Sequence, residues 1–237
     1  MYGIILLAQH EYSHYYTNKN LSVFDKLLTL IIPIFTGGTN EQFAILHAID
    51  HHQTVGEEFD EDLINKIKQN FRIFKEDPVK ECYKYQHIYT YLLIPLFSVV
   101  AILVDTYIVI KYHYKIPNSH LIKILVQKML FVYLLFILPY KKLKKEWSKY
   151  LFIILFMASL SVWIFEYFNH ADEETTDKTL NKSLCWHQKV KTASVNWKHN
   201  KFIDFFTYGL DKHVEHHFFP CVSSNNMKYV TPFFKDY

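Results

Sequence analysis

The sequence predicts an all-α fold in which an integral-membrane helical bundle carries a histidine-rich helical cap. Two observations support this prediction. Half of the 237 residues are hydrophobic and 21% are charged, yet the mean hydropathy is −0.03, a mixture expected from a few very apolar segments and a polar remainder. In addition, eight of the fourteen histidines fall in three clusters, each next to an apolar segment.

The composition also excludes several classes of protein. The net charge is only +3 and Arg72 is the sole arginine, so the chain has no dense basic groove for nucleic acid. Cys82, Cys185 and Cys221 are isolated, which argues against a secreted disulfide scaffold and for a reducing compartment. The sequence contains no glycine-rich phosphate loop and no G-x-S-x-G motif. Met1–Gln9 lacks the basic start and the cleavage site of a signal peptide.

The N-terminal part combines a histidine pair with short apolar runs. Met1–Ala8 is apolar but shorter than the roughly 20 residues that cross a bilayer. His10 and His14 follow it and share one helical face because they are four positions apart. A chance surface pair would have the same spacing. Leu21–Phe35 is short for a full span, so it could be a span, a re-entrant helix or an interfacial helix. Gly37-Gly38 should end it.

The second cluster reads His47-Ala-Ile-Asp-His51-His52. On an α-helix His47 and His51 share a face, and His52 lies about 100° further round. Such a set can donate nitrogen ligands to two metal ions rather than one. The polar and acidic stretch that follows, Gln53–Cys82, predicts a solvated helical cap.

Three strongly apolar stretches follow. Ile88–Ile110 is interrupted by Pro95 and Asp105, whereas Leu121–Tyr140 and Tyr150–Phe168 are each long enough to span. If the histidine clusters on both sides share one site, an even number of crossings separates them. We therefore expect Ile88–Ile110 to lie in the interface. The alternative pairs it with Leu121–Tyr140, which keeps the basic loop between the last two stretches inside the cell, as the positive-inside tendency favours.

A boundary histidine and a third cluster complete the set. His170 ends the last apolar stretch, where an imidazole is costly to place without a function, although a ring that reaches the interface is the plain alternative. His213, His216 and His217 fall at i, i+3 and i+4, on one helical face just before Pro220. Imidazole is the commonest metal-binding side chain and suits iron, zinc or copper. A solvated, histidine-rich helix end is the alternative reading.

The order H-x-x-x-H, H-x-x-x-H-H, H-x-x-H-H resembles the three histidine boxes of the integral-membrane fatty acid desaturases and their hydroxylase relatives. His213–Pro220, which reads His-Val-Glu-His-His-Phe-Phe-Pro, is similar to the third box. Gln86–Tyr89 and Thr192–Asn196 resemble flanking segments of the front-end, linoleoyl-CoA-desaturase-like branch. The resemblance extends from about Ala8 to Pro232, so we expect one desaturase-like domain over residues 1–237.

The resemblance implies a metal centre and an activity. The metal centre would use O2 and two electrons from an external donor to introduce a double bond into a fatty acyl chain, so no acid or base side chain is expected beyond it. Glu11, Asp50, Asp172 and Glu215 sit beside ligand positions and could accept imidazole N–H groups, or could be solvated carboxylates. The implied ligands of two iron ions are His10, His14, His47, His51, His52, His170, His213, His216 and His217.

The resemblance also implies partners and a location. The substrate would be an acyl chain carried by CoA or by a lipid. The electron donor would be a separate protein such as cytochrome b5 or ferredoxin, because the chain has no His-Pro-Gly-Gly haem motif. The endoplasmic reticulum membrane is the expected location, with the histidines facing the cytosol. Compared with the family, the chain starts late and ends early, so we expect truncation at both ends. Two alternatives stay open, an acyl or sphingolipid hydroxylase and a non-catalytic metal-binding membrane protein.

Overall fold

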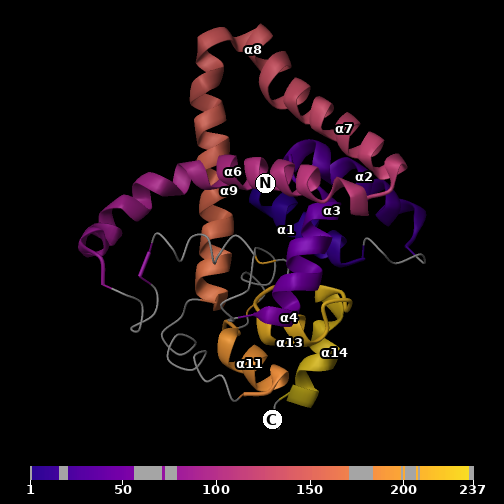
Figure 1. The fold of residues 1–237 in the computed structure, drawn as a ribbon, viewed down its shortest axis with the longest axis vertical. Coiled ribbons are helices and arrows are strands. Elements are labelled where there is room, and N and C mark those ends of the chain that lie inside the picture. Colours follow the sequence, from indigo (N-terminus) through magenta and orange to yellow (C-terminus); the bar gives the residue numbers. More distant parts are fainter. Residues whose placement is uncertain are drawn as a thin grey trace. The chain divides into compact units, whose positions relative to one another are not determined.

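The computed structural model describes residues 2–15, 21–55, 71–72, 79–170, 184–198, 200, 207 and 209–234. Every regular element in this part of the chain is a helix, which confirms the all-α prediction (Figure 1). The chain divides into two compact units. Unit 1 comprises Met1–Ile45 and Leu93–Val162, and unit 2 comprises Leu46–Leu92 and Trp163–Tyr237.

In unit 1 the first helices pack around one another: α1 lies against α2 and α3, and α2 lies against α7. A small apolar core forms where α6 meets α7, from Val109, Ile116 and Ile124. The helices of this unit are α1 (Tyr2–Tyr15), α2 (Val23–Thr36), α3 (Asn40–Phe43), the C-terminal part of α6 (Gln86–Lys111), η3 (His113–Lys115), α7 (Asn118–Val132), η4 (Tyr133–Ile137), α8 (Leu138–Leu143), η5 (Lys144–Glu146) and most of α9 (Trp147–His170).

Local sequence explains where α2 begins and ends. At its start the Ser22 hydroxyl oxygen accepts a hydrogen bond from the backbone N–H of Asp25 (3.1 Å). At its end Gly37 has φ 76°, and a Cβ there would lie 2.7 Å from Cζ of Phe131 on α7. Only glycine satisfies both the left-handed backbone and this close approach. The predicted stop at Gly37-Gly38 is confirmed.

The helix α6 is bent where the sequence places a proline. Its two halves meet at 72° at the break between Ile94 and Leu96, because Pro95 has no N–H to continue the backbone ladder. Past the break, the N–H of Ser98 donates to Oγ of Ser159 on α9 (2.9 Å), and the two hydroxyls also bond (2.9 Å). A neighbouring helix thus supplies the acceptor for a donor exposed by the break.

Asp105 interrupts the apolar run of residues but not the helix. The helix continues to Lys111, and Asp105 is buried and bonded within unit 1. Its carboxylate accepts hydrogen bonds from the N–H and the hydroxyl of Thr39 (2.8 and 2.9 Å) and pairs with Lys128 Nζ (2.5 Å). A helix tolerates a buried aspartate when the side chain is fully bonded in this way.

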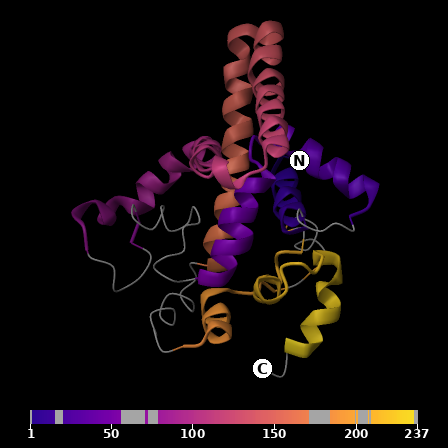
Figure 2. The same cartoon turned by 45° about the vertical axis from the view of Figure 1, so that its right-hand side comes forward.

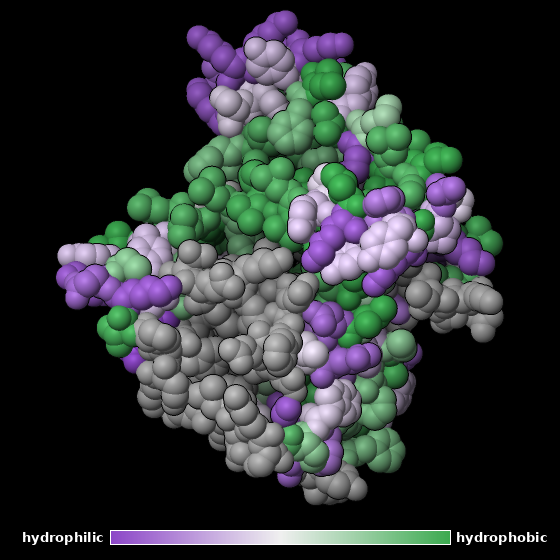
Figure 3. All heavy atoms as spheres, viewed as in Figure 1, coloured by the Kyte–Doolittle hydropathy of each residue, from purple (hydrophilic) through white to green (hydrophobic). Residues whose placement is uncertain are grey.

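The most apolar part of unit 1 is a helical hairpin. α7, η4 and α8 run to a turn at Lys144, and α9 runs back from it (Figures 1 and 2). In the described chain, Asn118–Ile164 is the stretch that is long and apolar enough to cross a membrane, and the two halves of α6 together would make a second. Figure 3 shows hydrophobic surface over the hairpin.

Unit 2 consists of short helices and the ends of longer ones. Val55, Val190 and Ala193 form its small apolar core, against which Phe218 packs. Gln53–Cys82, predicted as a helical cap, lies mostly outside the described residues. The helices are most of η1 (Ala44–His51), α4 (His52–Thr54), η2 (Glu81–Tyr85), the first residues of α6, the last residues of α9, α11 (Trp186–Ala193), α13 (His213–Phe218), η6 (Ser224–Asn226), α14 (Met227–Val230) and η7 (Thr231–Phe234).

Candidate metal centre

His47 and His51 of the second cluster lie on a π-helix, not on the α-helix that the spacing predicted, and His52 begins α4 directly after it. η1 is π-helical over Ala44–His51, a conformation that is rare and is frequently found at functional sites. Each residue turns through a smaller angle when hydrogen bonds run from i to i+5. As a result, the ring of His47 lies 5.0 Å from that of His51 and also 5.0 Å from that of His52. All three side chains are buried.

The third cluster forms the short helix α13, as its spacing predicted. His213, His216 and His217 are buried, and the helix ends at Phe218, before Pro220. The Nε2 atoms of His213 and His217 are 3.1 Å apart. The offsets i and i+4 therefore bring two imidazoles of this helix together on one face.

Four Nε2 atoms from three parts of the chain converge in unit 2. His170, the last residue of α9, has its Nε2 at 3.3 Å from that of His51 and at 2.8 Å from that of His213. His217 adds the fourth through its contact with His213. Ligand nitrogens of His51, His170 and His217 all lie within 4.8 Å of one another, so one ion could contact all three.

The tautomer of His170 follows from a backbone contact. Its Nδ1 lies 2.9 Å from the carbonyl oxygen of Ala193. A carbonyl oxygen only accepts, so Nδ1 carries the hydrogen, and Nε2 of the neutral ring presents its lone pair to the cluster. A bond of this kind on the distal nitrogen is the usual support for a histidine that binds a metal.

The environment also keeps His217 neutral. Burial, and then the neighbouring histidines His52, His213, His51 and His170, hold its pKa well below the usual range. A neutral imidazole has an unprotonated nitrogen that can coordinate a metal.

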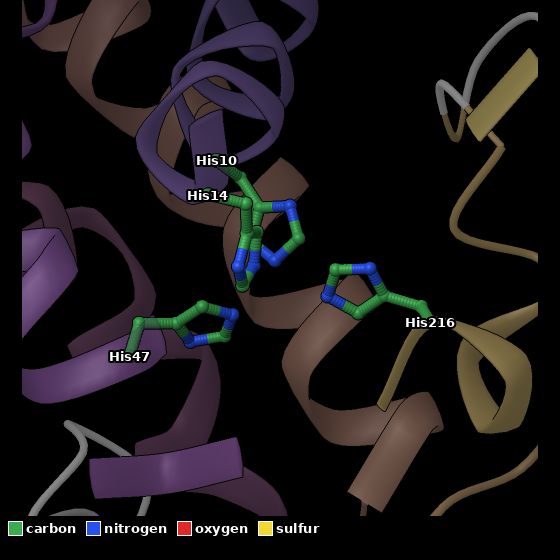
Figure 4. A group of neighbouring side chains, drawn as sticks. All are labelled: His10, His14, His47 and His216. Atoms are coloured by element: carbon green, nitrogen blue, oxygen red, sulfur yellow. The ribbon is translucent and has the colours of Figure 1, made fainter. Parts of the chain in front are cut away.

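Two further histidines of unit 2 lie beside this cluster. The rings of His47 and His216 are 6.4 Å apart and nearly parallel (Figure 4). The ring of His52 lies 4.8 Å from that of His216 and 4.4 Å from that of His217, so it connects His216 to the cluster.

The first cluster belongs to unit 1. His10 and His14 are both buried on α1, and their rings meet edge to face at 4.9 Å (Figure 4). The predicted i,i+4 pair is therefore present, and it points into the protein rather than to solvent. Phe43 packs against His10, with ring centroids 5.9 Å apart.

Two residues outside the predicted ligand set, Asn196 and Trp186, bond to the segments that carry the histidines. Asn196 donates through Nδ2 to the buried carboxylate of Glu215 (2.6 Å), and its Oδ1 accepts from the N–H of Val214 (2.8 Å). The indole N–H of Trp186 donates to the carbonyl oxygen of His52 (3.3 Å). The segment Thr192–Asn196 is identifiable in the sequence by its resemblance to the family, but that resemblance does not predict the hydrogen bonds that Asn196 makes.

The four predicted carboxylates have different surroundings. Glu11 is buried beside His10 in the sequence, and Asp50 is half-buried on η1. Glu215 is buried, and its recorded partner is the amide of Asn196 rather than an imidazole. Asp172 lies outside the described residues.

The histidines left out of the clusters behave as surface residues where the structure describes them. His87, His113 and His187 are exposed. His120 is half-buried and lies 3.2 Å from a carboxylate oxygen of Glu41 through Nδ1. His199 is outside the described residues.

Helices that bring several buried imidazoles together define a histidine-rich helical protein whose clusters could hold a metal ion. The particular family follows from comparison. A family model for fatty acid desaturases matches residues 1–237, and the chain belongs to this family. Its members are oxidoreductases that in general depend on two irons, and they are typically membrane-bound. No curated protein and no solved structure matches the chain.

Proposed function

We propose that this protein is an O2-dependent fatty acyl desaturase that introduces a double bond with two electrons from an external donor. The convergence of Nε2 atoms from His51, His170, His213 and His217, with successive pairs 2.8–3.3 Å apart, carries the proposal. Family membership supports the class of reaction. The quoted flanking motifs support the front-end, linoleoyl-CoA-desaturase-like branch.

The residues present fit iron. Iron accepts imidazole nitrogen, and the tautomer of His170 and the low pKa of His217 both leave a nitrogen free of a proton. Bound iron would supply the O2 activation that hydrogen removal from an unactivated methylene requires.

We propose two ion positions, each surrounded only by imidazoles. All-nitrogen ligation avoids the cost of burying carboxylates next to one another. One position would use His51, His170, His213 and His217 of unit 2. His10, His14, His47, His52 and His216 are the further ligands that we propose for the two ions.

The chain's other residues would orient these ligands. The carbonyl of Ala193 holds the hydrogen of His170 on Nδ1. Asn196 fixes Glu215 and the N-terminal end of α13. Glu11, Asp50 and Asp172 remain proposed hydrogen-bond acceptors for imidazole N–H groups.

The partners follow from the reaction. We propose a fatty acyl substrate bound to CoA or to a lipid, and an electron donor such as cytochrome b5 or ferredoxin. The hairpin of α7, α8 and α9 would cross the membrane of the endoplasmic reticulum, with the histidines at the cytosolic side, and α6 would lie in the interface. The bend of α6 at Pro95 supports this placement, because neither half alone reaches the length of a span.

Expression in a desaturase-deficient host, with a reductase and donor supplied, tests the proposal. Gas chromatography of total fatty acids should show a new unsaturated product for the wild type and for His187→Ala, and none for His217→Ala. Iron per purified chain is measured in parallel. A chain loaded with two irons that makes no double bond would contradict the proposal. A hydroxylated product would indicate the alternative that the protein is an acyl or sphingolipid hydroxylase. Bound zinc without iron would indicate a non-catalytic metal-binding protein.

A further inference from the structure

The turn of the apolar hairpin carries a dense cluster of positive charge. Residues 141–149 include five lysines and one glutamate, a net charge of +4 (5 − 1). Glu146 pairs with Lys149 (2.7 Å). The other four lysines are exposed, and within the described residues no carboxylate pairs with them. Figure 3 shows this hydrophilic end directly beyond the hydrophobic surface of the hairpin. We call Lys141, Lys142, Lys144 and Lys145 the basic turn.

Aromatic side chains separate the basic turn from the apolar part of the hairpin. Tyr140 precedes it and is 58% exposed, and Tyr150 follows it and is 53% exposed. The ring of Trp147 stacks on that of Tyr150, with centroids 6.4 Å apart. Exposed apolar side chains continue along both arms, as Leu134 and Ile137 on one and as Phe152, Ile153 and Met157 on the other.

This order of charge, aromatic rings and apolar surface matches the layers at the edge of a bilayer. Tyr and Trp concentrate at the level of the headgroups, and lysines extend beyond them. α9 has 24 residues and is therefore about 36 Å long, enough to cross the hydrocarbon layer from this turn.

The backbone of the basic turn is strained at Lys144. Lys144 has φ 53° and ψ −136° and is the one non-glycine residue with positive φ in the described chain. Glycine adopts this conformation at lower cost. A lysine kept where glycine is easier indicates that its side chain has a use.

We infer that the basic turn binds the headgroups of anionic phospholipids. Ammonium groups act as point charges toward phosphate, and the basic turn holds four of them with which no carboxylate of the described residues pairs. Each lysine near an anionic surface strengthens association about fivefold. The inference rests on the part of the proposed function that places the hairpin across a membrane, and it does not depend on the metal or the reaction.

Lipid selectivity of the full chain in bilayers tests the inference. The chain is reconstituted in phosphatidylcholine with a trace of spin-labelled phosphatidylglycerol or spin-labelled phosphatidylcholine. Electron paramagnetic resonance then gives, for each labelled lipid, the fraction whose motion is restricted by contact with the protein. At low salt the relative association constant should exceed about 5 for phosphatidylglycerol, and in 1 M salt it should approach 1 because the charges are screened. The variant K141Q/K142Q/K144Q/K145Q should show no preference, whereas its lysine-to-arginine counterpart should keep it.

A second measurement locates the lipid at the turn. Brominated phosphatidylglycerol should quench wild-type tryptophan fluorescence more than brominated phosphatidylcholine does, and the difference should disappear in Trp147→Phe. Equal restriction of both labelled lipids by the wild type would overturn the inference. Equal preference in the glutamine variant and the wild type would overturn it as well. If neither lipid is restricted at all, the chain does not span the bilayer, and the membrane placement itself fails.

Discussion

The Nε2 atoms of His51 and His170 lie 3.3 Å apart, although 119 positions separate the two residues in the chain. His51 comes from the π-helix η1 and His170 from the last residue of α9. The carbonyl of Ala193 fixes the His170 ring from the other side. Three distant segments thus meet at one imidazole, which makes His170 the most informative residue to change.

Replacing His170 with Ala should remove one of two proposed ion positions. Its Nδ1 bond to the carbonyl of Ala193 directs its Nε2 lone pair at the cluster. We expect bound iron to fall from about two to about one per chain and turnover to fall at least about 100-fold. Iron analysis of the purified protein and product chromatography measure both. His187→Ala, at an exposed position, is the control; an unchanged iron content in His170→Ala would contradict the assignment.

Replacing Asn196 with Ala should loosen α13 without touching a proposed ligand. The change removes two hydrogen bonds and leaves the buried carboxylate of Glu215 without its amide donor. The expected loss of unfolding free energy is about 1–3 kcal/mol, measured as a lower thermal midpoint in detergent. Asn226→Ala, which changes an exposed asparagine, should have little effect. Equal midpoints for the two variants would show that the Asn196 bonds do not hold the helix.

The metal-free protein should lose stability as the pH falls. The pKa of His217 is well below its usual range in the folded state and about 6.5 in the unfolded chain. Below pH 6.5 the unfolded state therefore binds a proton that the folded state does not. The free energy of unfolding has its full value above pH 6.5. Below that pH it decreases by up to about 1.4 kcal/mol per pH unit. Unfolding midpoints of iron-free protein at pH 7.5, 6.0 and 5.0 test this. His217→Gln should flatten the dependence, and His187→Gln should not.

Sequence spacing predicted the histidine groups because helical periodicity is local. Offsets of three and four positions bring His213 and His217 together on any helix, and the structure has them 3.1 Å apart. The glycine stop after α2 and the bend at Pro95 were predictable for the same reason, since each depends on the backbone of one residue. Whether the helices cross a membrane, and whether the histidines hold iron, remain predictions.

Long-range pairing and helix type could not be read from the sequence. Nothing in the spacing of His47, His51 and His52 distinguishes a π-helix from an α-helix. The contact of His170 with Ala193, and that of Asn196 with Glu215, join segments that the chain brings together only after folding. The burial of Asp105 could not be predicted either, because its partner, Lys128, lies 23 positions away on another helix.

Breaking the pair of Asp105 and Lys128 should destabilise unit 1 strongly. Lys128 Nζ binds both the carboxylate and the carbonyl oxygen of Gly37 (2.5 Å each), and Asp105 also caps Thr39. Together they fix the turn after which α3 begins. Asp105→Ala or Lys128→Ala should each cost about 3–5 kcal/mol, because one buried charge is left alone. The double variant should lose much less than the sum. Thermal unfolding of the three variants measures the coupling energy between Asp105 and Lys128. If the losses of the two single variants simply add up in the double variant, the two side chains are not coupled and the prediction is contradicted.

Replacing Lys144 with Gly should stabilise the hairpin while weakening its proposed affinity for anionic lipid. Glycine relieves the strain at φ 53°, and we expect a gain of about 1 kcal/mol, partly offset by the greater freedom of the unfolded chain. Lys145→Gly removes the same charge where φ is not positive, so it should lower stability and lipid preference together. Thermal midpoints and the selectivity for spin-labelled lipid, measured on the same preparations, separate the two effects. A Lys144→Gly protein that is less stable than the wild type would show that the turn is not strained, and the argument that a lysine is retained there for its charge would fall with it.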